Sequence, residues 1–85
     1  MFVTVSYDIG DDGRRNKVCN ELKNYGERVQ YSVFECDLNS AQTKELQGKL
    51  GTLINRRQDS IRYYFLCKGC MEKVSIQGSR GVSKA

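Results

Sequence analysis

The sequence contains no histidine, and this absence removes two kinds of chemistry. Without histidine, the chain cannot carry out acid–base catalysis of the ribonuclease A type. It also cannot build a mixed cysteine–histidine zinc site. Zinc takes four ligands, and the CxxC motif Cys67–Cys70 offers only two thiolates per chain. We interpret the motif as a turn in which Gly69 supplies the bend, with a zinc shared across a dimer or a reversible disulfide as alternatives.

Long hydrophobic runs are absent as well. The longest apolar stretch is far shorter than the ~20 residues of a membrane helix, so no membrane partner is expected. The N-terminus enters a strand-like segment without the basic and then apolar pattern of a signal peptide. We therefore expect a cytoplasmic protein with reduced cysteines. Cys19 and Cys36 are at apolar positions of the sequence, so we expect both to be core thiols.

The excess of positive charge is small: 14 Lys and Arg against 10 Asp and Glu give a net charge of +4. This balance is compatible with a nucleic-acid partner and equally with solubility alone. A chain of 85 residues forms one domain with a thin core, which oligomerisation would help to stabilise. We place the domain at residues 1–76 and a polar tail at residues 77–85.

The first predicted strand ends in a carboxylate. Residues 2–9 alternate between apolar and polar, which predicts one face in the core and Asp8 on the other face. The core face comprises Val3, Val5, Tyr7 and Ile9. A charge at the end of a buried strand is costly unless it is paired or binds a metal or substrate. Asp8 is therefore a candidate ligand, with a turn or helix-capping role as the alternative.

Two segments have helical periodicity. Residues 12–25 place apolar side chains at i, i+4 and i+7, and Gly26 is expected to end that helix. A second helix is predicted at about residues 41–56, after a cap at Asn39 and Ser40. The first two turns of the first helix carry Arg14, Arg15 and Lys17. Cations are unfavourable there unless an anion such as phosphate binds the helix start.

The remaining segments predict a sheet. Residues 28–38 are extended, as one bent strand or two short ones, and strands are predicted at residues 59–67 and 72–76. Strand, helix, strand or hairpin, helix, strand is the split βαβ pattern, so we predict an α+β fold, a ferredoxin-like βαββαβ sandwich. Both helices should cover one face of the sheet. The other face should lie open or pair with a second molecule.

Several segments together resemble a known family. They are Tyr7-Asp8-Ile9, an Arg-rich first helix, Tyr25-Gly-Glu-Arg-Val-Gln-Tyr-Ser-Val-Phe-Glu-Cys36 and Asp59-Ser-Ile-Arg-Tyr-Tyr64. In this order they are similar to the small CRISPR-associated endonucleases of the spacer-adaptation module, the Cas2 family. The resemblance covers residues 1–76.

The resemblance implies a homodimer in which the C-terminal segment, here residues 72–76, adds a strand to the partner's sheet. It also implies that residues 28–38 form a hairpin. The activity it implies is a metal-dependent endonuclease on single-stranded RNA or double-stranded DNA that also bridges CRISPR integrase subunits. Asp8 would be the catalytic metal ligand. The resemblance ties Arg15, Lys17, Arg28 and Phe34 to nucleic-acid binding, and from their chemistry we add Arg14 as a phosphate contact and Tyr7 as a base-stacking candidate. We identify no integrase-docking motif in residues 82–85.

The chemistry agrees with this resemblance. Mg²⁺, or Mn²⁺, binds through one or two carboxylates and keeps several waters, so two Asp8 side chains across a two-fold axis would hold one ion. Asp11 and Asp12 are candidates for a second acid, with a turn and helix cap as the alternative. Further phosphate contacts are predicted for Arg56, Arg57 and Arg62. Tyr7, Tyr31 and Phe34 are candidates for stacking on bases, with a core or dimer position as the alternative.

Two functions from different classes follow. One is a metal-dependent nuclease with Asp8 as ligand. The other is a non-catalytic dimeric adaptor that holds duplex DNA and bridges integrase subunits. A ferredoxin-like small-ligand regulator is a third possibility.

Overall fold

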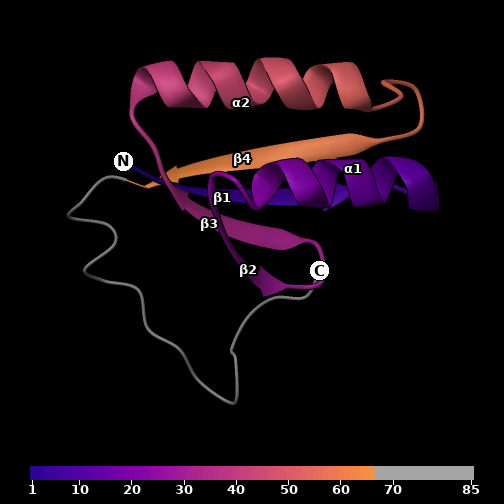
Figure 1. The fold of residues 1–85 in the computed structure, drawn as a ribbon, viewed down its shortest axis with the longest axis horizontal. Helices are drawn as coiled ribbons and strands as arrows, with labels where there is room; N and C mark the ends of the chain where they lie inside the picture. Colours follow the sequence, from indigo (N-terminus) through magenta and orange to yellow (C-terminus); the bar gives the residue numbers. More distant parts are fainter. Residues whose placement is uncertain (67–85) are drawn as a thin grey trace.

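The computed structural model describes residues 1–66, which form an α+β sandwich of the ferredoxin-like type (Figure 1). Its elements are β1 (Phe2–Asp8), α1 (Asp12–Leu22), β2 (Gly26–Gln30), β3 (Val33–Asp37), α2 (Ser40–Leu53) and β4 (Ser60–Leu66). The sheet has the order β2-β3-β1-β4, and every neighbouring pair is antiparallel. The fold class and the β2–β3 hairpin are therefore confirmed. The predicted strand at 72–76, its exchange and the Cys67–Cys70 turn lie outside the described residues.

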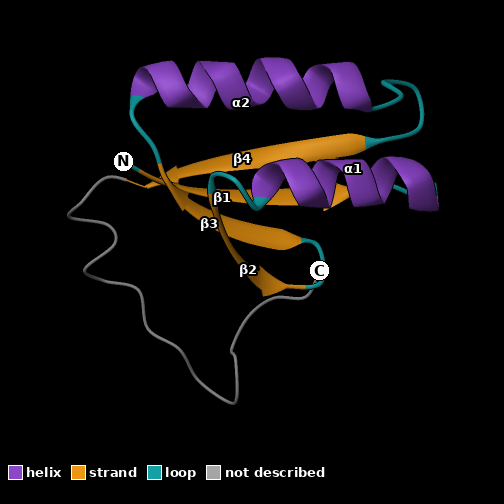
Figure 2. Ribbon diagram, viewed as in Figure 1, coloured by secondary structure: helices purple, strands orange, loops and turns teal. Residues whose placement is uncertain are grey.

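Both helices pack on one face of the sheet (Figure 2). Alternate residues of β1 are buried on that face, as the polar–apolar alternation predicts. Buried side chains of β1, β3 and both helices form one continuous core. Its members include Val3, Val5, Val18, Leu22, Phe34, Leu46 and Leu50. The even-numbered residues of β1 consequently lie on the opposite, uncovered face, where Asp8 is exposed.

The first helix begins where expected and ends early. Asp11 caps it, because its carboxylate accepts a hydrogen bond from the Arg14 amide at 2.8 Å. It ends at Leu22, so the prediction that it continues to residue 25 and stops at Gly26 is wrong. Gly26 instead begins β2. A Cβ there would overlap the Glu35 carbonyl oxygen and lie 2.9 Å from Cys36 Cα, so only glycine allows the two strands to approach this closely.

The second helix has the predicted cap and a shorter C-terminal end. The Asn39 side chain accepts from the Gln42 amide at 2.8 Å, while the Gln42 side chain accepts from the Asn39 amide at 2.9 Å. This reciprocal pair is a capping box. The helix ends at Leu53, so Arg56 and Arg57 lie in the turn before β4 and not in the last helical turn.

Within residues 1–66, neither helix is long and apolar enough to span a bilayer.

Candidate functional site

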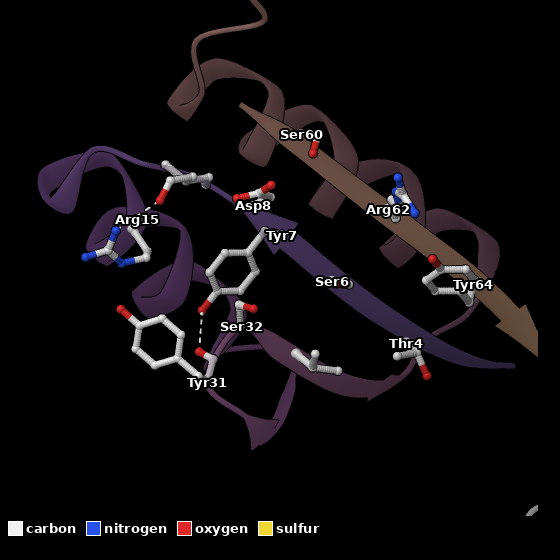
Figure 3. Close-up of a pocket in the computed structure, with 12 residues that line it drawn as sticks. Thr4, Ser6, Tyr7, Asp8, Arg15, Tyr31, Ser32, Ser60, Arg62 and Tyr64 are labelled. Atoms are coloured by element: carbon white, nitrogen blue, oxygen red, sulfur yellow. Dashed lines mark hydrogen bonds between the residues drawn. The ribbon is translucent and has the colours of Figure 1, made fainter. Parts of the chain in front are cut away.

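The uncovered face of the sheet has a hollow of about 740 Å³ at the end of β1 (Figure 3). Two neighbouring strands supply most of its floor, since β1 and β4 pair antiparallel and their outward residues share this face. The outward residues are Thr4, Ser6 and Asp8 from β1, and Ser60, Arg62 and Tyr64 from β4. Arg15 and the β2–β3 turn, with Tyr31 and Ser32, close one side. The hollow thus combines polar and apolar groups and carries charges of both signs.

Asp8 is the carboxylate of this hollow. It lies at the last position of β1, in register with Ser60. Its side chain is exposed and forms no ion pair with any residue of the described chain. Arg62 lies close enough to Asp8 for the carboxylate charge to affect its pKa. The pKa of Arg62 is raised, first by the neighbouring Tyr64 hydroxyl and also by the negative charge of Asp8. Asp8 therefore faces the hollow as a carboxylate without an ion-pair partner among residues 1–66.

The other acids near this end of the sheet have structural roles. Asp11 caps α1, and Asp12 pairs with the guanidinium of Arg15. Asp59 is buried and is held by Arg14. The helix-cap alternative is therefore confirmed for Asp11, whereas Asp12 lies in the first turn of α1 and forms an ion pair.

Arg15 and Arg28 are held in place from different elements. Arg15 Nη1 donates to the Ile9 carbonyl at 3.0 Å, so its guanidinium lies over the end of β1. Arg28 donates from Nε and Nη2 to the Tyr31 carbonyl, at 3.1 and 2.7 Å. Lys17 is exposed on α1. Arg15 and Arg28 line one hollow together, whereas Lys17 is not among the residues that line it.

The Arg14 side chain binds Asp59 and Gln58 and is not among the residues that line the hollow. Its Nε lies 2.7 Å from Asp59 Oδ2 and its Nη2 lies 3.1 Å from Asp59 Oδ1, while Nη2 also reaches Gln58 Oε1 at 3.3 Å. This fork ties the start of α1 to the loop before β4. The Nε and Nη2 groups of Arg14 therefore have a structural role, and its phosphate contact stays a prediction.

Tyr7 and Phe34 also leave the predicted nucleic-acid surface. Phe34 is 0% exposed and Tyr7 is 3% exposed, and their ring centroids lie 6.3 Å apart within the core. Burial is the main reason that the pKa of Tyr7 is raised. A ring packed in this way cannot stack on a base, so the core alternative replaces that prediction for both residues. The exposed ring beside them is Tyr31.

Ser60 is one of the hollow residues that the sequence did not single out. Its position depends on the register between β1 and β4, which are more than 50 residues apart in the chain and carry no local signal for that pairing.

The donors of the hollow fit a hard cation only in part. Carboxylate and hydroxyl oxygens are the ligands that Mg²⁺ accepts, and Mg²⁺ needs only one or two carboxylates because it keeps its waters. Residues 1–66 contain no cluster of three or more potential metal-ligating side chains. One copy of the chain thus offers a single carboxylate, and a second carboxylate would have to come from another copy.

Comparison with known proteins identifies the family of the chain. The family model for CRISPR associated protein Cas2 matches residues 1–74. The chain belongs to this family. A relative from Synechocystis sp., CRISPR-associated endoribonuclease Cas2 3, is 42% identical over 99% of the chain and 92% of its own length.

Solved Cas2 structures have the same fold. Streptococcus pyogenes Cas2 superposes with a TM-score of 0.80 at 35% identity, covering 92% of this chain and 100% of that one. A chain of a partial Cas6-RT-Cas1–Cas2 complex superposes with a TM-score of 0.79 at 25% identity, covering 99% of this chain and 98% of that one. The family resemblance and the ferredoxin-like fold are thereby confirmed.

Proposed function

We propose that this Cas2 protein is a metal-dependent endonuclease of CRISPR adaptation that cleaves phosphodiester bonds of single-stranded RNA or double-stranded DNA. The observation that carries the proposal is Asp8: an exposed carboxylate at a strand end, without an ion pair in the described chain, in a hollow that Arg15 and Arg62 also line. Relatives named endoribonucleases support a nuclease activity.

A homodimer would complete the site. The sheet has one uncovered face, and Tyr64 on that face is 48% exposed, so pairing of two such faces would bury apolar surface. A two-fold axis through this face duplicates every residue on it. Two Asp8 carboxylates near the axis would then provide the ligands that a single chain lacks for one Mg²⁺ or Mn²⁺ ion.

Each group then has a defined role. The ion, when bound, neutralises charge on the scissile phosphate and acidifies a water. Asp8 holds the ion. Arg15, Arg28 and Lys17 bind phosphates and position the strand, an electrostatic contribution that does not depend on base sequence.

A second function is favoured by one specific observation: the hollow of one chain contains a single carboxylate, whereas two-metal nucleases carry several. In this alternative the protein is a non-catalytic dimeric adaptor that holds duplex DNA and bridges integrase subunits. The similarity to a chain from a complex containing Cas1 supports an integrase partner in either case.

The two functions separate in one assay. Wild type, Asp8→Ala and a control acid variant, Asp37→Asn, are incubated with single-stranded RNA and with duplex DNA, in Mg²⁺ or in chelator. Asp37 is exposed at the far end of β3, where it pairs only with the terminal amine in the described chain. We expect wild type and Asp37→Asn to cleave in Mg²⁺ and not in chelator. Asp8→Ala should cleave in neither. No cleavage by any variant, with duplex binding intact, would support the adaptor instead, and cleavage by Asp8→Ala equal to that by wild type would remove Asp8 from the catalytic role.

A further inference from the structure

We propose that Tyr31 is a stacking platform for an unpaired nucleobase, which makes single-stranded nucleic acid the preferred ligand at this end of the molecule. The inference rests on the proposed nucleic-acid function. It adds a residue that binds the base, beside the cations that bind the phosphates.

Tyr31 is the exposed aromatic residue of the β2–β3 turn. It is 63% exposed, the same fraction as the N-terminal Met1 and more than Tyr64 or Phe65. An aromatic side chain loses much favourable burial when it stands in water. The position is therefore one where a ligand would gain from contact with the ring.

Two guanidiniums lie close to this ring. The Arg28 Cζ lies 5.3 Å from the ring centroid and the Arg15 Cζ lies 5.8 Å from it, both within cation–π range. Arg15 comes from α1 and Arg28 from β2, and both line one hollow together with Tyr31. A nucleotide offers a base and a phosphate at neighbouring positions. An aromatic ring beside two cations matches both.

The backbone under the ring is fixed in advance. The Tyr31 carbonyl accepts two hydrogen bonds from Arg28, at 3.1 and 2.7 Å, and lies 3.5 Å from the Tyr7 hydroxyl that donates to it (Figure 3). The next carbonyl, that of Ser32, accepts from the Tyr7 amide at 3.0 Å. The turn is thus anchored to the end of β1, directly before Asp8. Because the backbone is already fixed, only the side-chain freedom of Tyr31 is lost when a ligand stacks on the ring.

The ring stands on a rim between two hollows. One is the hollow that contains Asp8, and the other, of about 250 Å³, lies on the α1 side and is lined by Arg15, Lys23 and Arg28. Pairing of two open sheet faces would leave this α1 side uncovered. A strand that lies in the cation-lined hollow would therefore pass Tyr31 on its way to Asp8.

Stacking on an exposed ring selects for single strands. In a duplex each internal base already stacks on its neighbours, and its face is not available to a protein side chain. An unpaired base has a free face, and every base can use it, so the contact carries no sequence preference. The platform thereby favours single-stranded nucleic acid over an intact duplex.

The test compares Tyr31→Leu and Tyr31→Phe with wild type. Binding of a fluorescent single-stranded RNA and of the matching duplex is measured by anisotropy at several salt concentrations. We expect Tyr31→Leu to weaken single-strand binding about 5- to 100-fold. The salt slope should stay unchanged, because no phosphate contact is lost. Tyr31→Phe should bind within about twofold of wild type, since it keeps the ring. Duplex binding should not change.

A base-specific signal gives a second readout. 2-Aminopurine placed in the single strand loses fluorescence when it stacks, and we expect this quenching with wild type and Tyr31→Phe but not with Tyr31→Leu. If Tyr31→Leu binds the single strand as tightly as wild type does, the stacking platform is overturned and the proposed function stands. Failure of wild type to bind any nucleic acid would overturn both.

Discussion

Arg14 and Asp59, 45 positions apart in the chain, form a two-pronged ion pair with nitrogen–oxygen distances of 2.7 and 3.1 Å. The Asp59 side chain is fully buried, and its Oδ2 also accepts from the Asn55 amide at 2.8 Å. This junction sets the start of β4, and therefore the position of Ser60 opposite Asp8, relative to the start of α1.

The junction should make stability depend on pH in the acid range. The hydrogen bonds from Arg14, and also that from the Asn55 amide, lower the pKa of Asp59 below its ordinary value. Its stabilising effect is complete above the unfolded pKa, which is about 4, and is lost as the pH falls through the lower folded pKa. We expect Asp59→Asn to lower Tm at pH 7. The difference from wild type should shrink below about pH 4, measured by thermal melts. A difference that persists unchanged at pH 2–3 would contradict this role.

Gly26 should tolerate no side chain. A methyl group there would overlap the Glu35 carbonyl oxygen, so β2 would have to move away from β3. We expect Gly26→Ala to lower the free energy of unfolding by about 1–3 kcal/mol, the usual effect of overpacking. The control is Gly10→Ala, because a Cβ at Gly10 meets nothing within 4 Å. Urea titrations that show equal losses for the two variants would refute the explanation.

At Gly48, in contrast to Gly26, a substitution should stabilise the protein. It lies in α2, is exposed, and a Cβ there would meet nothing within 4 Å. Gly48→Ala should raise the free energy of unfolding by about 1 kcal/mol, because alanine has the higher helix propensity. At Gly51 a Cβ would lie 3.2 Å from Arg56 Nη2, so Gly51→Ala should gain less. Chemical denaturation of both variants tests the ranking.

Lys17 should contribute charge and nothing else to nucleic-acid binding. It is exposed near the start of α1, whereas Lys44 is exposed on α2. We expect Lys17→Ala to reduce the slope of log affinity against log salt by about 0.7–0.9, one phosphate contact, and Lys44→Ala to leave it unchanged. An unchanged slope in Lys17→Ala would remove Lys17 from the phosphate-binding set.

Local patterns predicted much of this fold. The alternation of β1 gave the correct exposed face for Asp8, and Asn39 gave the correct start of α2. The end of α1 was mispredicted because Gly26 has two possible uses, as a helix stop or as a strand contact. Only its neighbour across the hairpin, Cys36, decides between them.

The candidate site was predicted less completely, because its members are sorted by long-range contacts. Arg14 and Arg15 are adjacent and identical in type, yet Arg14 binds a buried acid from the loop before β4 and Arg15 lies in the hollow. Sequence periodicity does not separate these two arginines. It does place Tyr7 on the core face of β1, whereas the exposure of Tyr31 follows from the β2–β3 turn, which periodicity left open.

Initial rates of RNA cleavage in Mg²⁺ by wild type, by Asp8→Ala and by an equal, co-refolded mixture of the two test the central claim most directly. If two Asp8 side chains share one ion, Asp8→Ala is inactive. The mixture then retains about a quarter of the wild-type rate, because only dimers with two intact copies are active. A mixture that retains half the rate would show that each Asp8 acts alone. An Asp8→Ala protein as active as wild type would contradict the account altogether.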